Sequence, residues 1–200
     1  MKKLLVALLI AFASLAPSAT HPLMKSVFPL YILATNPNGA KVWWNLCTVE
    51  SINPDQHLFL GAAHCVLAGD TDQLGGQTYV GSNHYPVNVL RADREKDLAL
   101  LWSEQPAVGL VLRTRPIGWK EEVQLPSFQL GWSMFMLTTG RVTNPDGTIE
   151  GDTKAFLWHS IYGCGGSSGG PILDKNGALV SVEQVGVRNF EPCSPPMNTR

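Results

Sequence analysis

The stretch GCGGSSGGP at 163–171 contains the residues of this sequence best suited to nucleophilic chemistry. Ser168 stands two positions after Gly166 and directly before Gly169 and Gly170. A serine hydroxyl is a poor nucleophile until a base takes its proton and hydrogen-bond donors stabilise the oxyanion that its attack creates. Glycines let the backbone turn sharply and point N–H groups at one place. A flexible Gly/Ser linker is the alternative, but patterned apolar sequence flanks the stretch on both sides.

A candidate base and a candidate acid lie upstream. The segment FLGAAHC at 59–65 ends an apolar run with His64, between two alanines and a cysteine, a crowded setting that would hold an imidazole in place. Asp97 opens the apolar run DLALL, which suggests a carboxylate at the buried start of a strand. A carboxylate there would fix the imidazole tautomer and stabilise its charged form. Considered singly, a histidine such as His64 usually has a structural role, and an aspartate such as Asp97 usually marks the start of a strand.

The chain order His64, Asp97, Ser168 resembles that of the chymotrypsin-like (trypsin-fold) serine peptidases. GAAHC is similar to their TAAHC motif, DLALL to the aspartate motif in its bacterial HtrA/DegP-like form, and GSSGGP to GDSGGP or GNSGGP. The resemblance spans roughly residues 25–193 and includes the glutamyl-endopeptidase-like branch, with no PDZ domain following. It implies Ser168 as nucleophile, His64 as general base and then acid, Asp97 as orienter, and the N–H groups of Gly166 and Ser168 as oxyanion hole. Ser167 is the rival nucleophile.

The same resemblance implies a specificity pocket beside the nucleophile. Its substrate-binding residues would be Tyr162, Gly163, Gln184, Val185 and Gly186. Tyr162 stands at the pocket floor, where a carboxylate would favour Lys or Arg, so such a preference is not expected. A tyrosine there would fill the pocket and favour small or apolar side chains. Glu183 leaves two interpretations: it faces the pocket and attracts a basic residue or, as we prefer, it is a strand charge pointing outward.

The four cysteines allow three disulfide pairings, and sequence alone does not choose among them. The resemblance implies Cys47–Cys65, bracing the histidine loop, and Cys164–Cys193, joining the two walls of the pocket. No C-x-x-C spacing occurs, which disfavours a metal site. We expect neither a metal nor an organic cofactor.

The pattern of short apolar segments and turns predicts an all-β fold. The 19 glycines and 14 prolines are scattered, which suits short strands better than long helices. The expected strands are 28–34, 41–49, 57–60, 77–80, 86–92, 98–102, 122–125, 139–143, 155–159, 171–173 and 178–187, with turns at Asn38-Gly39, Asp146-Gly147 and Asn176-Gly177. The resemblance implies two antiparallel β-barrels, 20–110 and 111–200. We interpret the six tryptophans as barrel-packing residues.

Charge and the N-terminal segment limit the partners and the location. A net charge of −1 without a basic block disfavours nucleic acid and anionic membranes as partners. Residues 1–19 have the pattern of a secretory signal, in which Lys2-Lys3 precede an apolar run. This run is too short for a membrane-spanning helix, which needs about 20 residues. We therefore expect a secreted or periplasmic protein with no membrane contact after signal removal. The sequence leaves the oligomeric state open.

Two functions follow from these expectations. The first is a secreted serine endopeptidase acting on polypeptide substrates through an acyl-enzyme. The second is a catalytically inactive pseudoprotease that binds peptides or proteins. Seven residues follow Cys193, fewer than the closing strand and helix of such proteins. The second barrel would then be incomplete, and we consider a minimal barrel, a truncated gene or closure by a partner chain.

Overall fold

The computed structural model describes residues 21–69, 74–129, 134–147 and 156–184, and nearly all regular structure within them is β-strand. The strands of the first sheet are β1 (Val27–Thr35), β2 (Lys41–Asn53), β3 (Leu58–Gly61), β4 (Thr78–Val80), β5 (Tyr85–Pro86), β6 (Asn88–Asp93) and β7 (Leu98–Trp102). Those of the second sheet are β8 (Glu122–Gln129), β9 (Met134–Gly147), β10 (Phe156–His159), β11 (Pro171–Asp174) and β12 (Leu179–Val182). Two short 3-10 helices, η1 (Pro22–Lys25) and η2 (Ala63–Cys65), lie before β1 and after β3. The all-β prediction is confirmed.

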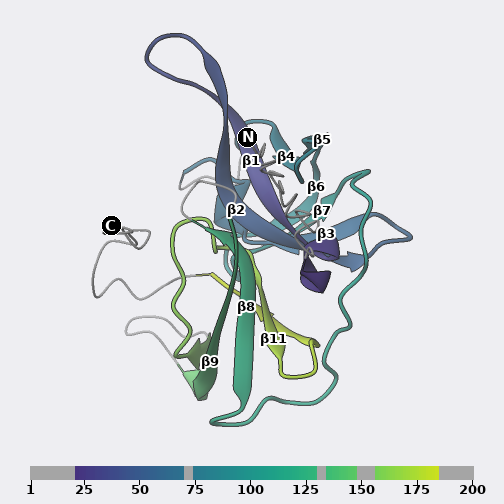
Figure 1. The fold of residues 1–200 in the computed structure, drawn as a ribbon, viewed down its shortest axis with the longest axis vertical. Helices are drawn as coiled ribbons and strands as arrows, with labels where there is room; N and C mark the ends of the chain where they lie inside the picture. The colour runs from purple at the N-terminus through teal and green to yellow at the C-terminus, as the bar shows by residue number, and fades with distance from the viewer. Residues whose placement is uncertain (1–20, 70–73, 130–133, 148–155, 185–200) are drawn as a thin grey trace, which may run out of the picture.

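Both sheets are antiparallel and curl around their own cores. The strand order is β5-β4-β1-β2-β3-β7-β6 in the first sheet and β10-β9-β8-β11-β12 in the second. Figure 1 shows the first sheet in the upper half of the view and β8, β9 and β11 in the lower half. The chain passes between them through residues 103–121, and the domain boundary at 110/111 stays a prediction. In this segment Leu110 donates its N–H to Ser51 of β2 over 2.8 Å, and Arg113 donates to Leu179 of β12 over 2.9 Å.

Two of the three expected turns form where glycine is needed. Gly39 (φ +86°) closes the β1–β2 hairpin and Gly177 (φ +81°) the β11–β12 hairpin, a backbone region that side chains disfavour. The expectation for Asp146-Gly147 was wrong, because both residues continue β9, where Gly147 pairs with Phe156. A Cβ on Gly147 would stand 2.9 Å from Cγ of the Trp158 ring. The glycine is therefore explained by packing under an indole.

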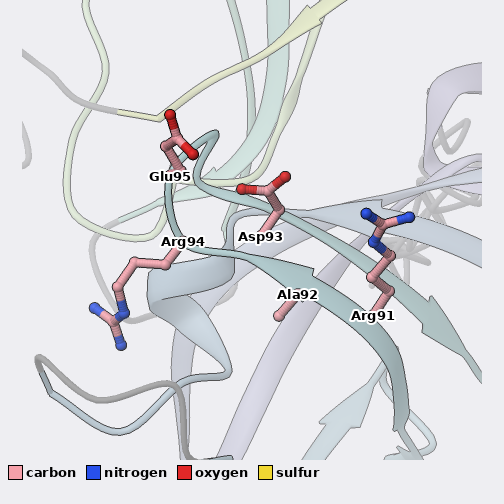
Figure 2. Close-up of a pocket in the computed structure, with 5 residues that line it drawn as sticks. All are labelled: Arg91, Ala92, Asp93, Arg94 and Glu95. Atoms are coloured by element: carbon pink, nitrogen blue, oxygen red, sulfur yellow. The ribbon is translucent and has the colours of Figure 1, made fainter.

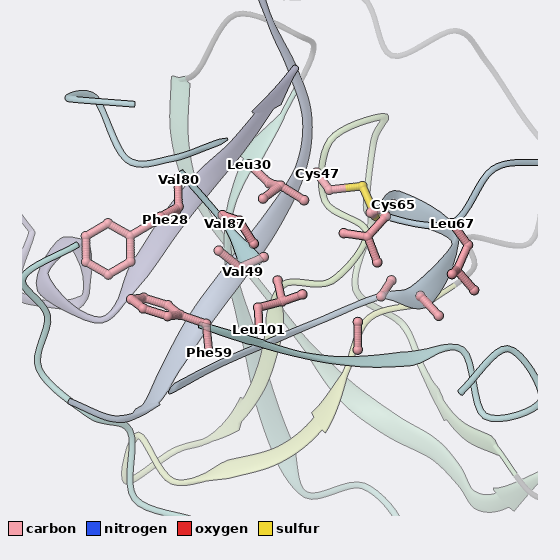
Figure 3. Packing of buried hydrophobic residues seen from close by; sticks show 14 residues of the cluster. Phe28, Leu30, Cys47, Val49, Phe59, Cys65, Leu67, Val80, Val87 and Leu101 are labelled. Atoms are coloured by element: carbon pink, nitrogen blue, oxygen red, sulfur yellow. A yellow bond between two sulfur atoms is a disulfide. The ribbon is translucent and has the colours of Figure 1, made fainter. Parts of the chain in front are cut away.

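The first sheet closes over an apolar core (Figure 3). Alternate residues of β2, including Cys47 and Val49, point into it, as expected for a strand with one buried face. Phe28 and Phe59 meet edge to face with ring centroids 5.9 Å apart. A second core forms within the other sheet from Val123, Leu125, Val142, Ile161 and Ile172.

A third apolar cluster joins the two sheets. Its buried members are Val27, Leu110, Phe128, Leu173 and Leu179. They come from β1, the connecting segment, β8, β11 and β12. The cluster therefore fixes the two sheets relative to one another, and with them the chain segments where they meet.

The tryptophans depart from the expected burial. Trp43 and Trp44 on β2 are 40% and 56% exposed, and Trp119 is 64% exposed, so these three do not pack a barrel interior. The proposed signal at 1–19 lies outside the described residues. Within the described residues, no helix has the length and apolar character needed to span a membrane.

Candidate active site

His64 and Asp97 form the best-defined polar contact of the predicted site. Asp97 Oδ2 lies 2.8 Å from His64 Nδ1, and Asp97 Oδ1 accepts the backbone N–H of His64 over 2.8 Å. A carboxylate facing Nδ1 selects the tautomer with its proton there, which leaves Nε2 able to accept one. The His64 side chain is 44% exposed and that of Asp97 22%, so the imidazole is reachable while its partner is sheltered.

A tight turn places Asp97 at this position. The turn connects β6 to β7, and Asp97 takes a left-handed conformation with φ +49°. Its N–H donates to Arg94 over 3.2 Å, and its carbonyl accepts the N–H of Ala63 over 3.2 Å. Aspartate is among the few side chains that tolerate this backbone region. Asp97 is thus fixed through its backbone as well as its carboxylate.

The histidine is held from its other side by a disulfide. Cys65, the residue after His64, is bonded to Cys47 of β2, as predicted. Cys65, Ala62 and Ala63 are buried in the first core, so the helical turn η2 has little freedom. Cys164 is disulfide-bonded as well. Its predicted partner, Cys193, lies outside the described residues.

Ser168 lies in a glycine turn that packs against the histidine segment. Gly166 and Gly169 have φ of +99° and +80°. A Cβ on Gly169 would stand 2.8 Å from the backbone nitrogen of Ala62 and 3.3 Å from Cα of Gly61. The structure therefore brings the residue after Ser168 into backbone contact with the segment that ends at His64. Only glycine permits this approach.

Thr48 of β2 connects the first sheet to both ends of that turn. Its N–H donates to the carbonyl oxygen of Ser168 over 2.9 Å, and its hydroxyl donates to the carbonyl oxygen of Gly166 over 2.8 Å. The same hydroxyl accepts the N–H of Phe128 over 2.9 Å. Thr48 is fully buried. Sequence reasoning missed this residue, because nothing local marks a threonine that bonds to a loop more than a hundred residues away.

The structure describes three of the predicted substrate-binding residues, Tyr162, Gly163 and Gln184. Tyr162 is 54% exposed, and the Nε2 of Gln184 donates to the carbonyl oxygen of Lys96 over 2.6 Å. Because Lys96 precedes Asp97, this bond ties the expected pocket wall to the aspartate turn. Val185 and Gly186 lie outside the described residues. The interpretation of Glu183 as an outward strand charge is wrong, because the residue is buried.

Two other features near these residues do not form the predicted site. A surface pocket on the β6–β7 turn is lined by Arg91, Ala92, Asp93, Arg94 and Glu95 (Figure 2), and it includes no predicted site residue. Cys47, His64 and Cys65 bring possible metal-ligand atoms within 4.8 Å of one another. The two sulfurs are bonded to each other, so they offer no thiolate to an ion.

Comparisons with known proteins bear on the family and the fold of this chain. A family model described as a trypsin-like peptidase domain matches residues 47–182. The chain belongs to the trypsin-like peptidase family. The structure of this trypsin-like peptidase is similar to that of the Rv3671c protease from M. tuberculosis in its active form, with a TM-score of 0.60 and 22% sequence identity. The match covers 82% of this chain and 72% of that one. A comparison with curated proteins found no match.

Membership of this family confirms the two-sheet fold that the resemblance implied. It also makes a peptidase acting on polypeptides the function to test. The individual roles of His64, Asp97 and Ser168 stay predictions.

Proposed function

We propose that this trypsin-like peptidase is a secreted serine endopeptidase in which Ser168, His64 and Asp97 act as nucleophile, base and orienter. The observation that carries the proposal is that Asp97 contacts His64 twice. One carboxylate oxygen faces Nδ1, and the other accepts the backbone N–H. A purely structural histidine needs neither a carboxylate on Nδ1 nor a side chain that is open to solvent. Here both features occur in a segment that packs against the Ser168 turn.

The proposed reaction has two stages. His64 Nε2 takes the Ser168 proton as the serine oxygen attacks the scissile carbonyl, and the N–H groups of Gly166 and Ser168 stabilise the oxyanion. The protonated imidazole then gives its proton to the leaving amine, and an acyl-enzyme remains. Water, activated by the same imidazole, attacks the ester and releases the carboxylic acid. Asp97 keeps its charge throughout and stabilises the imidazolium.

A serine-directed fluorophosphonate probe tests this proposal on the oxidised, folded protein. We expect labelling that Ser168→Ala abolishes and that the neighbouring control Ser167→Ala retains. Peptides blocked at both ends should be cleaved internally, which distinguishes an endopeptidase from an exopeptidase. Absence of labelling and cleavage by correctly folded protein would instead support the peptide-binding module. If Ser167→Ala alone abolished labelling, the nucleophile would be Ser167 and not Ser168.

We also propose secretion or export to the periplasm. The Cys47–Cys65 disulfide supports this location, because such bonds persist mainly in oxidising compartments. The N-terminal sequence of the protein recovered from a bacterial periplasm or medium provides the test. We expect it to begin between residues 17 and 21, and a mature protein that retains Met1 would contradict the proposal.

A further inference from the structure

The two residues that follow β12, Glu183 and Gln184, contact both turns of the proposed site. The carbonyl oxygen of Glu183 accepts the N–H of Gly169 over 2.7 Å, and the N–H of Glu183 donates to the carbonyl oxygen of Gly170 over 2.8 Å. The next residue, Gln184, donates from Nε2 to the carbonyl oxygen of Lys96 over 2.6 Å. Two consecutive residues therefore join the turn of the proposed nucleophile to the turn of the proposed acid.

The side chain of Glu183 anchors this segment to the second sheet. Glu183 Oε2 lies 2.9 Å from Nε2 of His159, the last residue of β10, and the two side chains are 7% and 11% exposed. Nδ1 of His159 accepts the N–H of Ile161 over 3.3 Å, so Nε2 carries the proton and donates it to the carboxylate. A buried carboxylate is costly unless it is paired, so this bond holds Glu183 in place. Gln184 thus extends from a fixed residue.

Gln184 acts on the peptide group that joins Lys96 to Asp97. The carbonyl oxygen of this group accepts from Gln184, and its N–H, which belongs to Asp97, donates to the carbonyl oxygen of Arg94 over 3.2 Å. The group lies in the turn between β6 and β7, outside the strand ladder. Both polar ends of one planar unit are therefore held, and this fixes the plane from which the Asp97 residue continues.

The backbone of Asp97 needs such support, because its φ of +49° is left-handed. A residue in this region keeps its conformation only where several contacts impose it. Rotation of the peptide group before it would turn the carboxylate away from His64, whose Nδ1 lies 2.8 Å from Asp97 Oδ2. The bond from Gln184 opposes that rotation, and it does so from the sheet that carries the nucleophile turn.

We propose that Gln184 is a positioning residue for the proposed catalytic groups. Through its bond to the Lys96 carbonyl, it holds the Asp97 carboxylate on the imidazole and keeps both in register with the nucleophile turn. This inference rests on the proposed endopeptidase activity. It differs from the substrate-binding role expected from the sequence, because a residue that binds substrate changes KM, whereas one that orients the reacting groups changes kcat.

Gln184→Met tests the proposal, because methionine keeps the length of the side chain and lacks the donor. We expect kcat for a peptide substrate to fall on the order of tenfold with KM little changed, since a misplacement of about 1 Å costs about 10²-fold. Gln184→Lys restores a donor of similar reach and should restore most of kcat. The control Gln105→Met removes a similar bond, from Nε2 to the carbonyl oxygen of Pro106 over 2.8 Å, and should leave kcat unchanged.

The fluorophosphonate probe separates positioning from substrate binding, because it reacts with the nucleophile and lacks the extended chain of a peptide. Its labelling rate should fall in Gln184→Met by the same factor as kcat and recover in Gln184→Lys. An unchanged labelling rate with a raised KM would assign Gln184 to substrate binding and overturn the proposal. Unchanged labelling and kcat with a lower free energy of unfolding would show a purely structural role and overturn it as well.

The proton on His64 Nδ1 gives a measurement that needs no activity. Its bond to Asp97 slows exchange with water, and NMR of protein with isotope-labelled histidine measures the exchange rate. We expect faster exchange in Gln184→Met than in wild type or Gln105→Met, and equal rates in all three would overturn the inference. Failure of the endopeptidase proposal is distinguishable, because the probe would then not label the wild-type protein, whereas the exchange rates would still decide the role of Gln184.

Discussion

Thr48 donates its backbone N–H to the carbonyl oxygen of Ser168 over 2.9 Å, and this bond joins the first sheet to the turn that precedes β11 of the second. The Thr48 hydroxyl adds a second crossing bond, to Gly166. Gly166 and Ser168 are the residues whose N–H groups we propose as the oxyanion hole. One residue of the first sheet, through its backbone N–H and its hydroxyl, therefore contacts peptide groups of both residues.

Thr48→Val tests this positioning role, because valine keeps the shape and loses the hydroxyl. The carbonyl of Gly166 and the N–H of Phe128 would lose a buried partner, at a cost of about 1–3 kcal/mol for each unsatisfied group. We expect kcat to fall on the order of tenfold with little change in KM, because the effect acts on the oxyanion and not on substrate binding. Thr48→Ser restores the hydroxyl and should restore kcat. Equal kcat for the valine and serine variants would contradict the role.

Asp97→Asn should nearly abolish activity while the protein stays folded. An amide at this position favours the wrong histidine tautomer, and a loss of kcat on the order of 10⁴-fold is expected. Steady-state kinetics beside a circular dichroism spectrum provide the measurement. Glu95→Gln, two residues earlier on the same turn, removes an equal charge and should retain activity. Comparable losses of kcat in the two variants would mean that negative charge on the turn matters and that the contact between Asp97 and His64 does not.

Gly169→Ala should destabilise the protein much more than Gly177→Ala. Both glycines have φ near +80°, so both substitutions carry the left-handed penalty of about 1–2 kcal/mol. Only Gly169 has backbone atoms where the new Cβ would stand, whereas nothing lies within 4 Å of Gly177. Urea unfolding of the two variants isolates the contact between the nucleophile turn and the histidine segment. Equal losses of unfolding free energy would show that this contact is loose.

Removal of the Cys47–Cys65 disulfide should lower the free energy of unfolding by about 3 kcal/mol, the usual value for a loop of this size. The double variant Cys47→Ala/Cys65→Ala leaves no unpaired thiol and keeps Cys164 unchanged. Because Cys65 adjoins His64, activity should also fall at temperatures where the variant is fully folded, where unfolding does not explain the loss. Activity equal to that of wild type would show that η2 is held by its core contacts.

The buried carboxyl of Glu50 should make the stability of the protein fall as pH rises. It is fully buried on β2, and neither carboxylate oxygen has a hydrogen-bond partner. Burial raises the pKa of its carboxyl well above the usual value, against a smaller lowering by its own backbone. The unfolded chain therefore ionises first as pH rises, and native stability falls from about pH 4.5 up to the raised pKa of the folded state.

Glu50→Gln should cancel that fall in stability. The unfolding free energy of the variant relative to wild type should be higher at pH 8 than at pH 4, measured by urea denaturation at both values. Glu104→Gln, which changes an exposed glutamate, serves as the control and should show no such difference. A constant difference across this pH range would show that Glu50 is ionised in the folded protein.

The strands were largely predictable, because a strand with one buried face leaves an alternating pattern that needs no knowledge of its neighbours. The run 98–102 agrees with β7 at both ends, whereas the segment 139–143 was only the middle of β9. The ends of β9 lack that pattern, since most of its residues are exposed or half-buried. The short helices η1 and η2 were missed, being too brief for a periodic signal.

The sequence determined which chemical groups this protein carries and in what order, because a nucleophile in a glycine turn, a histidine beside a cysteine and an aspartate before an apolar run are local features. Only the tertiary structure decided what those groups touch. A one-residue change in strand register reverses the face of every side chain, so the buried position of Glu183 could not be read from its strand. Thr48 likewise gained its role from a bond to Gly166 across 118 positions, a separation that no local pattern spans.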